Sequence, residues 1–242
     1  MNKMKKLALS LLLVLPMVVS AAGMGVYIPF SIGDSSSVTV SDDNSYSSDF
    51  DADIDYKSAA GIGFVFDSNI GKDKLFNYRV GIEYQKTTRD TYGDDEGSGS
   101  CTQFCDMTRL NLVQTFGFGV LRTPTVRLWV GPRINIAWNY QSTDYDVGYY
   151  DNTYTEAAFE FGIAPAVGVN VNLGRLVSLA FDVDYRFAAV VGGYDNGEFD
   201  SGTYSGGTRG ATARFSVLFR FGETFQPKSS QTQTQGVVDQ NL

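Results

Sequence analysis

Apolar and polar residues alternate with a period of two in segment after segment of the chain. This period is typical of β-strands that have two unlike faces. In 75–87, one face carries Phe76, Tyr78 and Ile82, and the other carries Arg79 and Glu83. The segments with this pattern are 24–33, 56–67, 75–87, 109–121, 126–140, 157–173, 176–188 and 211–221. They predict an all-β fold.

The connections between these segments alternate between long and short. The long ones are 34–55, 88–108, 141–156 and 189–210, and the short ones are 68–74, 122–125 and 174–175. This rhythm is typical of a series of hairpins in an outer-membrane barrel, where short turns face the periplasm and long loops face outward. We therefore predict an eight-stranded antiparallel up-and-down transmembrane β-barrel over 23–222.

The apolar faces indicate which side of the barrel meets lipid. A soluble barrel of the lipocalin type would place them inside. However, they hold more bulky side chains than an eight-stranded interior can pack, so we expect them to point outward. Aromatic residues near the segment ends are candidate interfacial girdles, among them Tyr56, Tyr84 and Phe118, and Gln114 interrupts the apolar face. Pro29, Pro132 and Pro165 lie inside predicted strands and should cause local bulges.

Two terminal segments lack this alternation. Residues 1–22 combine three lysines, the apolar run LALSLLLVLPMVV and a small-residue end, as in a cleaved secretory signal peptide. Residues 223–242 are polar and aperiodic, which predicts a flexible periplasmic tail. Cys101 and Cys105 are the only cysteines. After export we expect them to form a disulfide, because a metal site would need more ligands nearby.

Charged residues on the polar faces would project into the barrel lumen. The predicted lumen charge network is Arg79, Glu83, Arg127, Arg133, Glu160, Asp182, Asp184, Arg186, Arg214 and Arg220. Opposite charges in so narrow a lumen should pair, because an unpaired buried charge is costly. The first interpretation is a largely plugged polar lumen. The alternative is a narrow porin-like channel for small or cationic solutes, favoured by the small polar-face residues of 157–173.

The long connections are strongly acidic. Together with Lys57 they hold 19 of the 27 acidic residues and three basic ones, a net charge of about −16. Asp49, Asp51, Asp53 and Asp55 alternate with apolar residues, which suggests a carboxylate row on the mouth-facing side of an extended strand. This row is a possible Ca²⁺ site, set against a merely solvated acidic surface. No other cofactor is expected, and nucleic acid is an improbable partner for such loops.

Catalysis is disfavoured by composition. The chain has no histidine, so it lacks the Ser–His and Asp–His arrangements on which barrel enzymes of this kind depend. Tyrosines interleave with the acids in YDVGYYDNTY, a composition found in adaptable binding loops. We therefore expect a non-enzymatic protein with a structural or adhesion-like role and an extracellular ligand.

The layout resembles small outer-membrane barrels of the OmpA-transmembrane-domain and OmpX class. The resemblance rests on the opening strand GMGVYIPFSIG, the segment WVGPRINIAW and the last strand ATARFSVLFRF, and it covers about 23–222. It implies the outer membrane of a Gram-negative cell, with extracellular loops and periplasmic termini. Implied partners are outer-membrane lipid, lipopolysaccharide and the barrel-assembly machinery, for which the aromatic strand ending at Phe221 looks like the signal.

Overall fold

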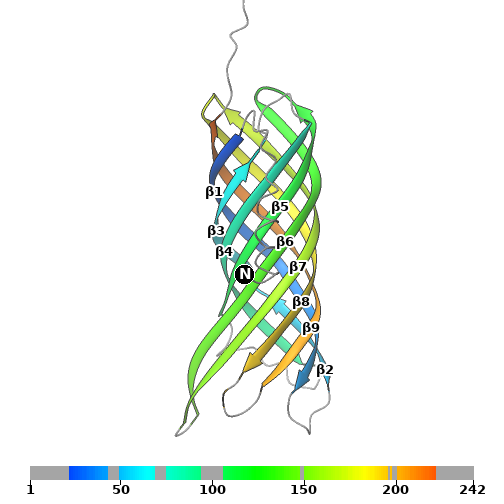
Figure 1. Cartoon of the computed structure of the whole chain (residues 1–242), viewed down its shortest axis with the longest axis vertical. Coiled ribbons are helices and arrows are strands. Elements are labelled where there is room, and N and C mark those ends of the chain that lie inside the picture. Colours follow the sequence, from blue (N-terminus) through cyan, green and yellow to red (C-terminus); the bar gives the residue numbers. More distant parts are fainter. Residues whose placement is uncertain are drawn as a thin grey trace, which may run out of the picture.

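The strands form a closed antiparallel ring (Figure 1). The computed structural model describes residues 22–42, 49–68, 75–93, 106–147, 150–195, 197 and 201–221. The strands are β1 (Ala22–Asp42), β2 (Phe50–Tyr56), β3 (Ala59–Asp67), β4 (Phe76–Gly93), β5 (Asp106–Arg122), β6 (Val126–Val147), β7 (Tyr150–Leu173), β8 (Val177–Asp195) and β9 (Ser201–Phe221). Over these ranges no helix is long and apolar enough to cross a membrane.

β1 pairs with both β2 and β3, β2 also pairs with β4, and each strand from β3 onward pairs with the next along the chain. β1 also pairs with β9, which closes the ring. Because β2 continues the line of β3 between β1 and β4, the ring has eight positions. This confirms the predicted eight-stranded up-and-down barrel. The short turns gather at one end, called the turn end, and the long hairpins at the other, called the hairpin end (Figure 1).

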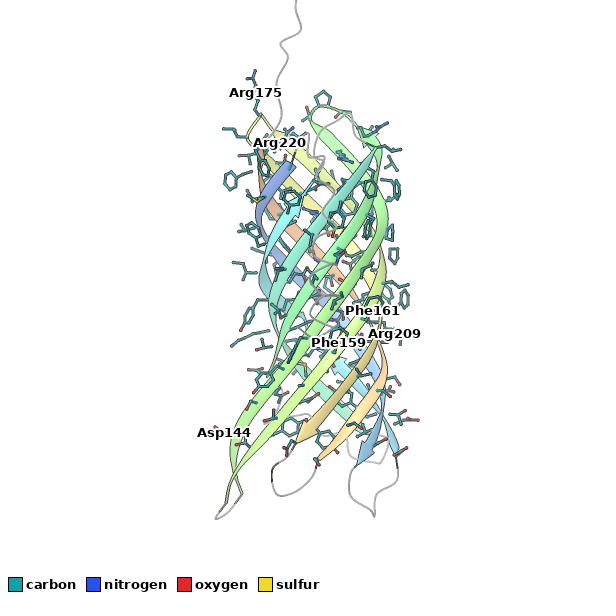
Figure 2. All side chains as sticks on the ribbon, in the orientation of Figure 1. Asp144, Phe159, Phe161, Arg175, Arg209 and Arg220 are labelled. Atoms are coloured by element: carbon teal, nitrogen blue, oxygen red, sulfur yellow. The ribbon has the colours of Figure 1, made fainter. Side chains whose placement is uncertain are left out.

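Side chains alternate between the lumen and the outer wall in the predicted phase over most of the barrel. Outward residues such as Trp138 and Ile82 are 60% and 55% exposed, whereas Glu83 and Trp129 are 0% exposed. Phe159 and Phe161 point away from the wall in Figure 2. The outward apolar side chains form a zone that we call the apolar band.

Two large aromatic side chains fill lumen space that glycines leave open. A Cβ at Gly63 would lie 2.4 Å from the ring of Tyr27, and a Cβ at Gly168 would lie 2.4 Å from that of Trp129. Such approaches are possible only where the facing residue has no side chain. Glycine on a polar face therefore marks where an aromatic ring crosses the lumen.

The strands are longer than the sequence predicted. Paired residues continue into all four predicted loops, and the β6–β7 ladder runs as far as Val147 and Tyr150. The prediction of four long loops was wrong in this respect: much of their length is β-hairpin. Beyond the apolar band the outer faces are no longer apolar and the phase of β1 and of the second strand changes, so the sequence pattern of the band does not continue, but the backbone ladder does.

The prediction of bulges at the three prolines was also wrong. Pro132 pairs with Pro165 in register, and Pro29 pairs with Arg214. The β7–β8 ladder omits pairs at Pro165 but resumes in the same register. A proline removes one donor without inserting a residue, so pairing is lost locally and the phase is kept.

True register shifts lie elsewhere. One is in β1, between Ile32 and Ser35, and the other is in β5, between Gly119 and Leu121. Gly33 has a φ of 65°, the left-handed conformation that bulges assign to glycine. Next to this bulge the second strand is interrupted at Lys57 and Ser58, which separates β2 from β3.

Several predictions lie outside the described residues. These are the signal peptide up to residue 21, the disulfide between Cys101 and Cys105, and the tail from 223 onward. The proposed cleavage point also stays a prediction, although Ala22 already pairs with Phe221 at the start of β1.

Candidate functional site: the lumen and the hairpin end

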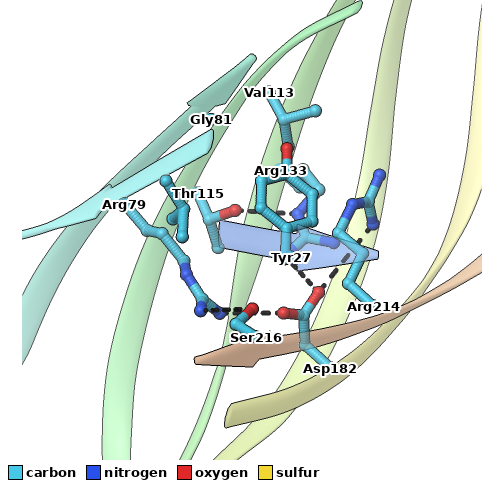
Figure 3. A pocket seen from close by; sticks show the side chains of 10 residues that line it. Tyr27, Arg79, Gly81, Val113, Thr115, Arg133, Asp182, Arg214 and Ser216 are labelled. Carbon is cyan, nitrogen blue, oxygen red and sulfur yellow. Dashed lines mark hydrogen bonds and ion pairs between the residues drawn. The ribbon is translucent and has the colours of Figure 1, made fainter. Parts of the chain in front are cut away.

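A network of ion pairs crosses the middle of the lumen. The Arg133 guanidinium donates to Asp182 at 2.7 Å and also to Asp184. Arg79 donates to the other oxygen of Asp182 at 2.8 Å, and Arg214 donates to Glu83 and Asp184. Figure 3 shows the side chains of β4, β6, β8 and β9 meeting around Tyr27. We call these residues the central network.

A second group of charges lies on the hairpin side of the central network. Arg109 and Arg186 both donate to one oxygen of Asp34, at 3.1 and 3.0 Å. Both also approach Glu160, with Arg186 Nη1 at 3.7 Å. Two arginines and two carboxylates thus alternate in a square, which we call the charge square. Each charge is buried and has an opposite charge beside it, as burial in a medium of low dielectric constant requires.

Little open space remains at the central network. The cavity lined by Tyr27, Arg79, Arg133, Asp182 and Arg214 (Figure 3) has a volume of about 10 Å³. That is room for roughly one water molecule. A hydrated ion could not pass this level without displacing paired side chains.

An apolar cluster fills the lumen nearer the hairpin end. It consists of Val38, Val40, Ala52, Ile54, Ala158 and Val190, with Tyr56, Tyr194 and Tyr204 packed against it. We call it the mouth cluster. Beside it, the Glu156 carboxylate accepts hydrogen bonds from Tyr204 at 2.7 Å and Tyr154 at 2.8 Å. Tyr56, expected in an outward girdle, instead packs inward.

Nine of the ten predicted lumen charges are buried inside the barrel: Arg79, Glu83, Arg127, Arg133, Glu160, Asp182, Asp184, Arg186 and Arg214. Arg127 lies toward the turn end, where it donates to Asn77 Oδ1 at 3.4 Å. Arg220 was wrongly included. It has the inward phase, but it lies beyond the last packed level and donates to the Gly174 carbonyl at the rim (Figure 2).

Sequence reasoning missed three members of the lumen network. Arg109 was on a polar face and could have been included on that signal. Asp67, which lies 3.9 Å from Arg79, was also on a polar face. Asp34 gave no signal, because it follows the bulge at Gly33 and fell in a predicted loop.

The acidic row of β2 faces the opposite way from the prediction. Asp51, Asp53 and Asp55 are exposed on the outer side, whereas Ala52 and Ile54 are buried in the mouth cluster. Since the interruption between β2 and β3 changes the phase of the strand, the apolar residues turn inward and the carboxylates outward. The expectation of a row on the mouth-facing side was therefore wrong.

No metal site is formed by these carboxylates in the described part of the chain. Successive outward residues on one strand are about 7 Å apart, and Asp51 accepts a hydrogen bond from Thr39 at 2.8 Å. Within the ranges that the structure describes, no group of three or more His, Cys, Asp or Glu side chains could hold a metal ion. Asp49 is exposed just before β2.

Comparison with solved structures identifies the architecture. The outer membrane protein OprG from Pseudomonas aeruginosa matches with a TM-score of 0.59 and 10% identity, covering 85% of this chain and 97% of that one. The fold is that of a small outer-membrane β-barrel. Ail, the attachment invasion locus protein of Yersinia pestis, matches with a TM-score of 0.39 and 9% identity, over 84% of this chain and 99% of that one. No family model and no curated protein matches the chain.

The likeness to OprG concerns architecture alone, because 10% identity says nothing about shared function. The features of this chain that bear on function are the filled levels of the lumen and the surface of the hairpin end.

Proposed function

We propose that the chain is an integral outer-membrane protein with a closed lumen, whose acidic hairpins contact a partner at the cell surface. It acts neither as an enzyme nor as a solute channel. The observation that carries this proposal is the succession of three filled levels along one lumen: the central network, the charge square and the mouth cluster.

The apolar band supports the membrane location. Its outward side chains include Phe64 and Phe161, which are 53% and 51% exposed. Water-facing surfaces rarely carry so many large apolar groups together, whereas the outer wall of a membrane barrel requires them. A bilayer would cover this band and leave both ends of the barrel in water.

The filled lumen favours surface contact over transport. Opening the central network would separate Arg133 from Asp182 and Asp184, and each separation would leave a buried charge without a partner. The mouth cluster adds an apolar level. A conducting path would have to open all three levels, and nothing in their packing supplies a ready route.

The hairpin end provides a rigid acidic surface. Asp51, Asp53 and Asp55 project from β2, which is held by pairing to both β1 and β4. Asp144 and Asp195 are also exposed, on β6 and β8. Carboxylates held on paired strands lose little freedom on binding. The surface therefore fits a partner that presents cationic groups.

Conductance of the full-length refolded protein in planar bilayers tests the closed lumen. We expect no steady current at neutral pH. The same preparation should migrate faster on a gel before boiling than after, which verifies that the barrel has folded. Stable single-channel currents from the folded protein would refute the closed lumen and restore the narrow-channel alternative.

Binding to an oligolysine peptide tests the acidic surface. The combined variant Asp51→Asn, Asp53→Asn, Asp55→Asn should bind about tenfold more weakly, since three exposed pairs contribute roughly 0.5 kcal/mol each. The control Ser35→Ala, Ser37→Ala changes outward residues of the adjoining β1 without altering charge. Equal binding by the wild type and the Asp variant would contradict the proposed role of β2.

A further inference from the structure

The outer wall carries one polar pair within its apolar band, on the face formed by β4 and β5. Gln114 projects outward from β5, where the sequence already showed a break in the apolar face. The hydroxyl of Tyr78 on β4 donates to Gln114 Oε1 at 3.1 Å. Both side chains are partly exposed. Neither belongs to the lumen or to the acidic surface.

The position of this pair is central in the band. On β5, Gln114 stands midway between the outward residues Leu110 and Phe118, which are 52% and 46% exposed. In the β4–β5 register it lies opposite Val80. Val80 in turn stands midway between Phe76 and Tyr84. Both strands therefore place the carboxamide at the level of the bilayer core.

A carboxamide at this depth retains unused hydrogen-bonding capacity. Gln114 accepts from Tyr78, but its Nε2 amide, with two donor hydrogens, has no acceptor among the residues that the structure describes. Hydrocarbon offers none, and an unmet polar group there costs several kcal/mol. The arrangement is costly unless another protein surface completes it.

We infer that the β4–β5 face is a contact surface for a second copy of this chain, with Gln114 and Tyr78 at its centre. The inference rests on the membrane location in the proposed function and is independent of the closed lumen. A carboxamide carries both a donor and an acceptor, so it can pair reciprocally with its own copy across a two-fold axis. Small polar groups are used in this way between membrane-spanning segments.

Aromatic rings pack against one another on the part of this face nearer the turn end. The ring of Phe116 lies 5.2 Å from that of Tyr78 and 6.4 Å from that of Phe76. Phe76 also contacts Phe118 edge-on, at 5.6 Å. Rings held by one another lose little freedom when a second surface packs on them, which lowers the entropic cost of association.

Sedimentation equilibrium of the refolded full chain in density-matched detergent micelles tests the inference. We expect a reversible monomer–dimer equilibrium. Gln114→Leu should raise the dimer dissociation constant about tenfold, the effect of losing two symmetric hydrogen bonds in an apolar medium. Tyr78→Phe should weaken the dimer less. Ile163→Leu, on the outward face of β7, is the matched control and should leave the equilibrium unchanged.

Gln114→Leu also distinguishes association from a structural role. Because Gln114→Leu also removes the acceptor of the Tyr78 hydroxyl, stability is compared in the double variant Gln114→Leu, Tyr78→Phe. Its folded monomer should be as stable as the wild type or more stable, with heat-dependent gel migration retained. A folded wild type that stays monomeric at every protein-to-detergent ratio overturns the inference and would point to a different membrane protein on this face. A dimer unaffected by both Gln114→Leu and Tyr78→Phe overturns the assigned surface. Failure of the wild type to fold into micelles would instead contradict the membrane location.

Discussion

The polarity of the lumen and of the outer wall is reversed between the apolar band and the hairpin end. Within the band the lumen is charged and the outer wall apolar, as with Glu83 inside and Ile82 outside. At the hairpin end the lumen holds the mouth cluster, and the outer face carries Asp51, Asp53 and Asp55. The same chain thus follows the rule of a membrane barrel at one level and the rule of a soluble barrel at the other.

The change between these regions occurs at the bulge at Gly33 in β1 and at the adjacent interruption between β2 and β3. Before the bulge at Gly33, even-numbered residues of β1 such as Ile28 point outward. After it, even-numbered residues such as Val38 point inward. The interruption at 57–58 changes the phase of the second strand at the same level. One inserted residue therefore lets even-numbered apolar residues of β1 point outward before the bulge and inward after it, with the buried polar residues Asp34 and Ser36 between the two sets.

The largest expected effect comes from breaking the central network within the band. Arg133→Ala removes the partner of Asp182 and Asp184 and should lower the free energy of unfolding by about 3–5 kcal/mol. Urea unfolding of the protein in lipid vesicles measures the difference. Arg122→Ala, at the exposed turn-end rim, is the control and should change little. A loss below about 1 kcal/mol for Arg133→Ala would mean that the network is hydrated and open.

A smaller effect is expected at the boundary between the two regions. Gly33→Ala forces a side chain into the left-handed conformation and should cost about 1–2 kcal/mol in the same unfolding measurement. Gly207→Ala is a suitable control, because a Cβ there would meet only the Ala188 carbonyl oxygen at 3.8 Å. If the two alanines had equal effects, the bulge would not require glycine and the phase change would have another cause.

The smallest effect is expected on the outward face of the hairpin end. Asp53→Asn should alter the unfolding free energy by less than about 0.5 kcal/mol, because the carboxylate is exposed. Its inward neighbour Ile54, changed to Ala, should cost about 2 kcal/mol through loss of packing in the mouth cluster. Hydrogen exchange in β1 and β2 would show whether the second loss is local. A reversed ranking would contradict the assigned orientation of β2.

The part of the fold within the apolar band could be predicted from sequence, because a polar lumen and an apolar exterior impose a strict period of two on each strand. Arg79 and Asp182 were therefore assigned to the lumen from phase alone. Their pairing could not be assigned, because the register between distant strands depends on shear around the whole ring. The candidate dimer face was visible only as an anomaly at Gln114, and its partner Tyr78 appeared only once β4 and β5 were aligned.

The side-chain orientations at the hairpin end could not be predicted from sequence, for a different reason. Phase was extended from the band into the acidic segment, and the interruption at 57–58 invalidated that extension for the β2 carboxylates. Asp34, which follows the shift at Gly33, had been placed in a predicted loop and received no phase at all. A bulge leaves little trace in composition, since a glycine in an alternating segment is equally compatible with a regular strand. The three prolines gave a stronger local signal and yet caused no shift, because they remove donors without adding residues.

Closure of the ring between β1 and β9 has a consequence for biogenesis. Ala22 pairs with Phe221, so the first and last described strands meet along almost their full length. Until β9 has been synthesised, β1 remains an open edge of unpaired peptide groups in a chain rich in exposed aromatic residues. Contacts this remote in sequence form slowly. The unfinished chain must therefore be shielded in transit, and its last strand decides when that protection can be released.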